Sequence, residues 1–260
     1  MVFKDGGRFA FLLLIFLVAV LLYCHKKVKA GFRPQIREIP AFKGIEEAVG
    51  RAAEMGRPIH FTPGSDAFNA QTAGMTLAGV ICLAHIASLC ARYDVRLLVS
   101  NRRPEVQPVT EEVVKQAFLT EGKSGAYRPT DIRFFSDDQF AYASGVVGVI
   151  SGENTAANIM LGGFYAESLM FAEAAATYGN IQVAGTASTS QIPFFVTTCD
   201  YVLIGEELYA AAAILSDDPA QVSSLVMQDI VRVVIICLVT IGAVATSFGW
   251  HGIKDIVLKW

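Results

Sequence analysis

Residues 158–184 read NIMLGGFYAESLMFAEAAATYGNIQVA, and this stretch decides the fold class. Two short β-prone runs, 158–161 and 181–184, flank a longer stretch, 165–178, that has the composition of a helix. Parallel strands need a crossover of this length, whereas antiparallel strands can be joined by a short hairpin. The stretch therefore predicts a strand, a helix and a second strand parallel to the first.

The same alternation extends along the chain in both directions. Residues 189–198 are ambiguous because Pro193 interrupts them, so a helix, a strand and an irregular loop all stay open there. Strands that alternate with helices imply right-handed crossovers and a sheet covered on both faces. We expect an α/β domain with a Rossmann-like, mostly parallel sheet flanked by helices. The other expected strands are 59–62, 95–99, 132–135 and 201–204, and the other helices 41–55, 72–93, 110–120, 137–149 and 206–215.

Two uncharged apolar stretches, 9–24 and 233–250, account for much of the 53% hydrophobic content of the chain. Each is close to the length of about twenty residues that crosses a bilayer. The first stretch has two alternatives, a cleaved signal peptide or a lipoprotein signal ending at Cys24. No small-x-small cleavage site follows it, and Leu22-Tyr23 is a poor match before a lipoprotein cysteine. We expect one transmembrane helix at each end of the chain.

Basic residues set the expected orientation, because they crowd directly after the first span at Lys26, Lys27 and Lys29. The positive-inside rule then places the central domain in the cytoplasm of a two-span protein of the cell (inner) membrane, with both termini outside. Lys254 and Lys259 after the second span disagree, but the first cluster is larger. The expected segments are a short external N-terminus (1–8), a span (9–24), a basic juxtamembrane collar (25–40), the cytoplasmic α/β domain (41–222), a helix entering the second span (223–250) and an interfacial amphipathic tail (251–260).

The charge and the cysteine content of the chain limit which binding partners and cofactors we expect. Residues 38–229 hold eleven Lys or Arg against twenty-two Asp or Glu, so the domain repels nucleic acid, and we expect no nucleic-acid partner. The collar residues Lys26, Lys27 and Lys29, with Trp250 and Trp260, are expected at the membrane surface. The five cysteines show no metal-ligand or redox spacing, so we expect no metal and no cofactor.

Ligands of an open parallel sheet bind outside the carboxyl ends of the strands, and here the residues after the strands are polar or glycine. Carboxylates at these positions are also what a helix N-terminus requires, so capping is the alternative to ligand binding. The glycine pairs permit an anion at a helix start, although no GxGxxG motif or P-loop lysine is present. The candidate ligand-binding residues are Arg102, Arg103, Gly162, Gly163, Gly185, Thr186, Glu206 and Glu207.

Arg102 and Arg103 are the most informative of these, because two adjacent guanidinium groups in an acidic domain need partners. The sequence offers Asp66, Asp137, Glu206 and Glu207 for an internal ion-pair network, and an anionic ligand or a neighbouring subunit as alternatives. No GxSxG or HExxH signature occurs, and His60 and His85 lie in apolar runs typical of core histidines. The sequence therefore does not favour an enzyme.

Small residues recur on several predicted helices. Residues 172–176 and 210–213 are rich in alanine, which suits close packing either within one domain or between subunits. In the second span, Gly242, Ala245, Thr246 and Gly249 place small residues one turn apart, as close transmembrane helix pairs prefer.

Four strings carry a resemblance: YDVRLLVSNRRPEV from Tyr93, DDQFAYA from Asp137, AANIMLGGFYAESL from Ala156, and IQVAGTASTSQIPFFVTTCDYVLIGEELYAAA from Ile181. They resemble an uncharacterised prokaryotic family of membrane-anchored proteins with a domain of unknown function, over residues 59–215. The resemblance implies no activity and no residue roles.

Together these features predict a membrane-anchored, non-enzymatic protein that forms a homo-oligomer or joins a larger membrane assembly. Its partners are the lipid bilayer and other copies of itself or other membrane subunits. The alternative is a membrane-anchored enzyme or sensor that binds a small anionic ligand, a nucleotide or other phosphate, at the carboxyl edge of the sheet.

Overall fold

The structure is a computed structural model that describes residues 7–32, 39–69, 72–216 and 218–247. The chain divides into two compact units, one formed by residues 37–216 and the other by residues 1–36 together with 217–260. Each unit is described by itself. Residues 1–6 of the expected external N-terminus (1–8), Gly249, Trp250, Trp260 and the tail 251–260 lie outside the described residues.

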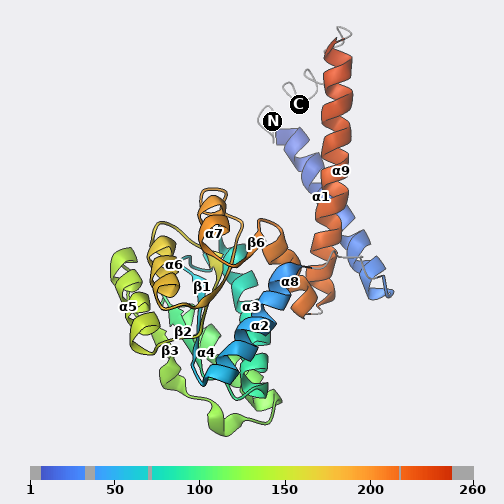
Figure 1. The fold of residues 1–260 in the computed structure, drawn as a ribbon. Coiled ribbons are helices and arrows are strands. Elements are labelled where there is room, and N and C mark those ends of the chain that lie inside the picture. Colours follow the sequence, from blue (N-terminus) through green and yellow to red (C-terminus); the bar gives the residue numbers. More distant parts are fainter. Residues whose placement is uncertain (1–6, 33–38, 70–71, 217, 248–260) are drawn as a thin grey trace. The chain divides into compact units, whose positions relative to one another are not determined.

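The larger unit is built on a six-stranded sheet in which every neighbouring pair is parallel (Figure 1). The strand order is β3-β2-β1-β4-β5-β6, which is the order of a doubly wound Rossmann sheet. The α/β class and the parallel sheet expected from the sequence are therefore confirmed. The strands are β1 (Ile59–Gly64), β2 (Leu97–Asn101), β3 (Ile132–Phe134), β4 (Ala157–Gly163), β5 (Ile181–Thr186) and β6 (Tyr201–Ile204).

Helices cover both faces of this sheet (Figure 1). Alternate residues of the strands point into two separate apolar cores, as the period of a β-strand requires. One core holds Phe61 and Ile159, and the other holds Met160 and Ala184. The first core lies under α2 (Pro40–Met55), α3 (Ala73–Arg92), α4 (Gln107–Thr120) and α8 (Glu207–Ser216), and the second under α5 (Gln139–Gly152), α6 (Glu167–Thr177) and α7 (Ile192–Thr198).

Several expected elements differ from the structure in their bounds, and two of the differences have a clear local cause. The second strand begins at Leu97 instead of residue 95, because the Val95 N–H still bonds the Cys90 carbonyl at the end of α3 and Asp94 turns the chain with a φ of 55°. The ambiguous stretch 189–198 forms the helix α7, and Pro193 falls in its first turn, where a missing N–H costs nothing. Two 3₁₀ turns, η1 (Ser124–Ala126) and η2 (Pro129–Asp131), connect α4 to β3.

The smaller unit contains two long helices, α1 (Gly7–Lys29) and α9 (Pro219–Ser247), which pack against each other. Cys24 and Val28 of α1 are buried, and His25 Nδ1 lies 3.3 Å from Ser223 Oγ of α9. The helix α1 continues past the expected end of the first span, so the collar residues Lys26, Lys27 and Lys29 form its last turn.

Three described helices are long and apolar enough to cross a membrane, instead of the one at each end expected from the sequence. The additional helix is α3, which was expected only as a domain helix. It lies between the sheet and the helices α4 and α8, so it is apolar on most sides, and 61% of its apolar window is buried. The corresponding windows of α1 and α9 are only 11% and 6% buried.

Candidate functional site

The strand order reverses between β1 and β4, which are neighbours in the sheet although the chain leaves them in opposite directions. In open α/β sheets this topological switch point is where ligands bind, at the carboxyl ends of the strands. The candidate site is therefore formed by the segments that follow β1, β4 and β2.

Glycines bring the ends of β1 and β4 into backbone contact. Gly64 has a φ of 98°, and the Ser65 N–H donates to the Gly163 carbonyl at 2.7 Å. A Cβ on Gly162 would lie 1.9 Å from the Pro63 carbonyl oxygen. The Gly162–Gly163 pair thus faces the chain's own β1 segment, and its missing side chains allow the two strand ends to meet.

The buried carboxylate of Glu167 joins three segments at this edge. It lies in the first turn of α6 and accepts a hydrogen bond from Ser65 Oγ, a second from the Tyr165 N–H at 3.1 Å and a third from Gln139 Nε2 at 2.5 Å. A helix N-terminus attracts negative charge, and here the protein supplies that charge from its own side chain.

Asp66 forms a second polar contact beside Glu167. The hydroxyl of Tyr165 donates to Asp66 Oδ1 at 2.8 Å, and Thr76 Oγ1 donates to the Asp66 carbonyl at 3.2 Å. The hydrogen bond to Asp66 raises the pKa of Tyr165, since it stabilises the protonated phenol. Asp66 is buried, whereas Tyr165 is half-exposed and is the accessible member of the pair.

The two arginines after β2 border this cluster, as the sequence placed them. Arg103 donates through Nε to the Ser65 carbonyl at 3.2 Å, and its Nη1 lies 3.5 Å from Asp137 Oδ1. Arg102 donates through Nε to the Asp137 carbonyl at 3.1 Å. Among the four carboxylates that the sequence offered, Asp137 pairs with Arg103, whereas Arg102 bonds only the backbone carbonyl of that residue. Within the described part of the chain, no carboxylate contacts the terminal nitrogens of Arg102.

The remaining candidate residues serve the ends of other elements. A Cβ on Gly185 would crowd Leu161 and Leu203, and Thr186 Oγ1 accepts from the Ser188 N–H at 3.2 Å. Glu207 accepts from the Ile204 N–H at 3.0 Å. Glu206 lies in the turn between β6 and α8. The structure therefore brings Arg102, Arg103, Gly162 and Gly163 together around β1, and leaves Gly185, Thr186, Glu206 and Glu207 around β5 and β6.

Helix α5 begins at Gln139, two residues later than the expected helix 137–149. Asp138, and not Asp137, is its N-cap, and Asp138 Oδ1 accepts from the N–H groups of Phe140 and Ala141. This leaves the Asp137 carboxylate for Arg103.

A buried polar network lies beneath α5 in the middle of the sheet. His60 Nδ1 lies 2.7 Å from Asn158 Oδ1, and His60 Nε2 lies 2.9 Å from Ser100 Oγ. Thr62 Oγ1 and the Tyr142 hydroxyl are 2.6 Å apart. Burial lowers the pKa of His60 to about 4, so the ring is neutral at pH 7. The expectation of a core histidine agrees with this environment.

Three comparisons with known proteins bear on this architecture. The family model described as "Domain of unknown function (DUF6754)" matches residues 2–257. The chain belongs to this family. No curated protein and no solved structure matches it. The match includes both terminal helices as well as the α/β unit, so the DUF6754 region comprises both units of the structure.

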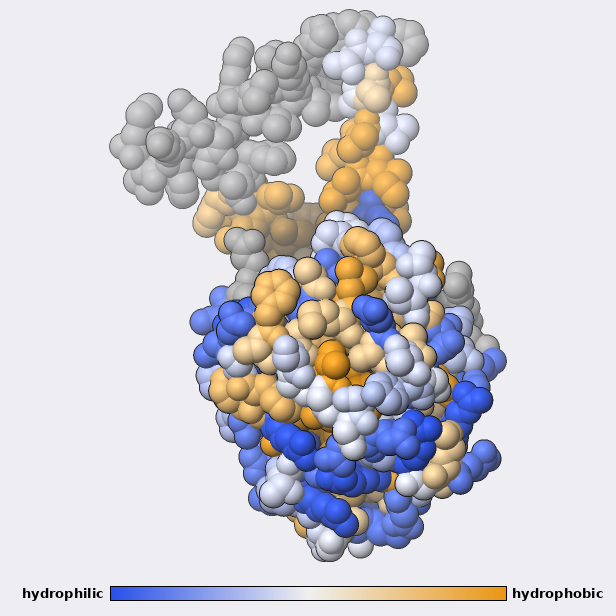
Figure 2. Space-filling view, turned by 60° about the vertical axis from the view of Figure 1, so that its left-hand side comes forward, coloured by the Kyte–Doolittle hydropathy of each residue, from blue (hydrophilic) through white to orange (hydrophobic). Residues whose placement is uncertain are grey.

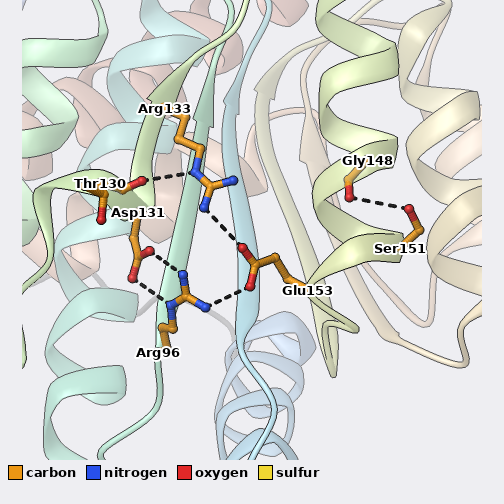
Figure 3. Close-up of polar contacts among 7 residues, drawn as sticks. All are labelled: Arg96, Thr130, Asp131, Arg133, Gly148, Ser151 and Glu153. Atoms are coloured by element: carbon orange, nitrogen blue, oxygen red, sulfur yellow. Dashed lines mark hydrogen bonds and ion pairs between the residues drawn. The ribbon is translucent and has the colours of Figure 1, made fainter.

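An ion-pair cluster at the opposite, amino edge of the sheet ties this DUF6754 domain together (Figure 3). Arg96, before β2, donates to both oxygens of Asp131 at 2.6 and 2.8 Å and to Glu153 at 2.8 Å. Arg133 of β3 reaches the other oxygen of Glu153 at 3.1 Å. The cluster fixes the ends of α5 and η2 to the strands and lies away from the switch point.

The sequence did not reveal Glu167, Tyr165 and Gln139, which hold the centre of the site. One signal was available, because Tyr165 and Glu167 directly follow the glycine pair at the end of β4 and open the next helix. Gln139 carried no signal, since its contact with Glu167 joins α5 to α6. In the described part of the chain, no group of three or more His, Cys, Asp or Glu residues could hold a metal ion.

Proposed function

We propose that the chain is a membrane-anchored, non-enzymatic protein that holds its acidic α/β domain at the cytoplasmic face and forms a homo-oligomer or part of a larger membrane assembly. One observation carries the anchoring: large apolar side chains are exposed along α1 and α9, where only 11% and 6% of the apolar windows are buried. A bilayer is the solvent that suits such surfaces. The burial of α3 favours two spans over three.

The basic end of α1 supports the orientation. Lys26, Lys27 and Lys29 form the last turn of the helix, and Lys27 Nζ lies 4.2 Å from the centre of the Phe32 ring. Cations favour a helix C-terminus, and they also favour the cytoplasmic side of a membrane. In this proposal the three lysines contact lipid head groups where the chain enters the cytoplasm.

The closed switch point supports a role in assembly over catalysis. The Glu167 carboxylate lies where an anion would bind at the start of α6, and the Gly162–Gly163 pair contacts β1. Ser65 is fully buried, so it has no access to a substrate. These groups bond one another, and their main effect is to hold the ends of β1 and β4 together.

Mass photometry of the full chain in nanodiscs, after extraction with a mild detergent, tests the proposal. We expect the protein to remain in the membrane fraction after alkaline carbonate washing and to yield particles of two or more copies. Monomers alone at all protein concentrations would contradict assembly, and release by carbonate would contradict the two spans.

A second candidate function is the binding of a small anion, a nucleotide or other phosphate, at Arg102. It is favoured by the terminal nitrogens of Arg102, which meet no carboxylate in the described part of the chain. Thermal shift with ATP and with inorganic phosphate tests it. A rise in the melting temperature of the wild type that is lost in Arg102→Ala would support this function. Equal rises in the wild type and in Arg102→Ala would contradict it.

A further inference from the structure

The three helices on one face of the sheet, α5, α6 and α7, are nearly free of charge. Their 32 residues include only two charged side chains, Glu167 and Glu173, and Glu167 is buried. On the opposite face, α2 alone carries five charged residues in sixteen. The charge of the domain is therefore distributed unevenly between its two faces.

Large apolar side chains are exposed on this uncharged face. Phe140 of α5 is 62% exposed and Val196 of α7 is 53% exposed, and Leu169, Met170 and Phe194 are more than one-third exposed. Figure 2 shows white and orange side chains gathered on this side of the domain, with most of the blue, hydrophilic ones below them. Exposed apolar patches of this kind mark interaction surfaces.

The outer side of α5 adds a surface with almost no side-chain bulk. Ala141, Ser144 and Gly148 lie outward at helical spacing, and a Cβ on Gly148 would meet no atom within 4 Å. A second helix can approach such a face closely, because interhelical distance depends on the side chains at the contact. The small side of α5 therefore offers room for a second helix, next to the bulky side chains of α6 and α7.

The hydroxyl groups on this face are already paired within their own helices. Ser144 Oγ donates to the Phe140 carbonyl at 2.9 Å, and Ser151 Oγ donates to the Val147 carbonyl at 2.8 Å. Figure 3 shows Ser151 turned back toward Gly148 on α5. Thr197 and Thr198 of α7 bond the Phe194 carbonyl in the same way. Burying these hydroxyls in an interface leaves none unsatisfied, so it avoids the usual cost of burying polar groups.

The net charge of the domain indicates which partner covers the outer face of α5–α7. Residues 37–216 hold nineteen acidic against twelve basic side chains, so two copies repel each other wherever their charged surfaces meet. The outer face of α5–α7 is where two acidic copies can meet without that repulsion. A membrane surface fits less well, because these helices carry no Lys or Arg to bind anionic head groups.

We infer that the outer face of α5–α7 is the surface through which the α/β domains of two copies of this chain associate. The inference rests on the proposed assembly and names the contact that makes it. A two-fold interface uses the same patch on both partners, so α5 of one copy packs beside α5 of the other, with the exposed Phe140, Leu169 and Phe194 around them.

A matched pair of glycine substitutions in the full chain tests the contact. Gly148→Glu places bulk and charge on the proposed interface, whereas Gly50→Glu makes the same change within α2 on the charged face. A Cβ added at Gly148 or at Gly50 would meet no atom within 4 Å, and Glu is a better helix former than Gly. Both variants therefore keep the fold. By mass photometry in nanodiscs, we expect Gly148→Glu to weaken association at least tenfold and Gly50→Glu to leave it unchanged.

Disulfide cross-linking supplies a second readout. Ser144→Cys is expected to form covalent dimers in the membrane, and Gln116→Cys on the outer side of α4 is not. Suppose that wild-type particles are oligomeric, that Gly148→Glu leaves them intact and that Ser144→Cys fails to cross-link. This result would contradict the α5–α7 contact but not the proposed assembly. Monomeric wild-type particles would contradict both the contact and the assembly. Monomers whose Ser144→Cys thiol is shielded from a water-soluble maleimide only in vesicles would assign the face to lipid and overturn the inference.

Discussion

The Ser65 hydroxyl at the end of β1 donates its hydrogen bond to the buried carboxylate of Glu167 in the first turn of α6. This contact crosses the topological switch point and joins segments 102 residues apart in the sequence. Gln139 of α5 donates to the other carboxylate oxygen, so one buried side chain ties together β1, α5 and α6. The carboxyl edge of the sheet is consequently held by the protein's own groups.

Glu167→Gln is expected to destabilise the α/β domain by about 2 to 3 kcal/mol, because an amide in place of the carboxylate sets one donor against the donors that now surround it. Chemical denaturation of the full chain in detergent, followed by circular dichroism, measures this change. The control is Glu173→Gln on the exposed side of α6, which should behave as wild type. Equal midpoints for the two variants would show that the buried contacts add nothing.

Gly162→Ala is expected to prevent stable folding of the α/β unit. A Cβ at this position would lie 1.9 Å from the Pro63 carbonyl oxygen, so either β4 or the segment after β1 must move. Gly152→Ala at the end of α5 is the control, since its Cβ meets nothing within 4 Å. We expect Gly152→Ala to equal or exceed wild type by up to about 1 kcal/mol. Limited proteolysis and thermal melts would reveal the difference, and a stable Gly162→Ala protein would contradict the packing described for the switch point.

Acidification is expected to destabilise the domain through His60. Burial lowers the folded-state pKa of His60 to about 4, against 6.5 for the free side chain. Above pH 6.5 the ring is neutral in both states and its contribution is fully present. Between pH 6.5 and 4 only the unfolded chain takes up the proton, so the free energy of unfolding falls by roughly 3 kcal/mol, and below pH 4 the loss is complete.

The measurement for His60 is the free energy of unfolding between pH 7.5 and 4 for the wild type and for His60→Gln. Carboxylates contribute the same pH dependence to both proteins, so the difference between the two curves isolates the histidine. The two curves should converge as the pH falls. Parallel curves would mean that the ring takes up its proton equally well in the folded state.

Arg96→Gln is expected to lower the free energy of unfolding by about 2 kcal/mol, because Asp131 is nearly buried and would lose both of its hydrogen bonds. Partial exposure of the arginine screens part of the effect. Arg92→Gln removes a comparable pair with Glu121 at the surface, and we expect no measurable change there. Urea midpoints of both variants in detergent give the comparison. A loss in Arg92→Gln as large as that in Arg96→Gln would argue that burial of Asp131 is unimportant.

The fold was largely predictable because each strand is a short apolar run and each crossover helix is long enough to be recognised. Composition alone does not separate a buried helix from a membrane span. The apolar composition of α3, which the sequence predicts as a domain helix, matches that of a span, since burial between the sheet and two helices selects the same residues as lipid does. The alanine runs of α6 and α8 left packing within the domain and packing between subunits open; most of these alanines are buried within the domain, and the exposed small face belongs to α5.

The candidate site was predictable only where its residues adjoin a strand end. Arg102, Arg103 and the Gly162–Gly163 pair were found because strand ends converge in a parallel sheet. The carboxylate partner of Arg103 could not be chosen from the sequence, because four carboxylates were available and only the side-chain geometry selects Asp137. The hydrogen bonds of Glu167 depend in the same way on the packing of α5 against α6.

The two-span orientation predicts which sites are accessible from outside the cell. In a background without native cysteines, Arg51→Cys and Ser124→Cys lie on exposed surfaces before and after α3. Both should resist a membrane-impermeant maleimide in intact cells and react after permeabilisation, because the proposed orientation, which rests on the positive-inside rule, has the whole α/β unit in the cytoplasm. Asp5→Cys should react without permeabilisation. Labelling of only one of the two domain sites would make α3 a third span, and labelling of both in intact cells would reverse the orientation.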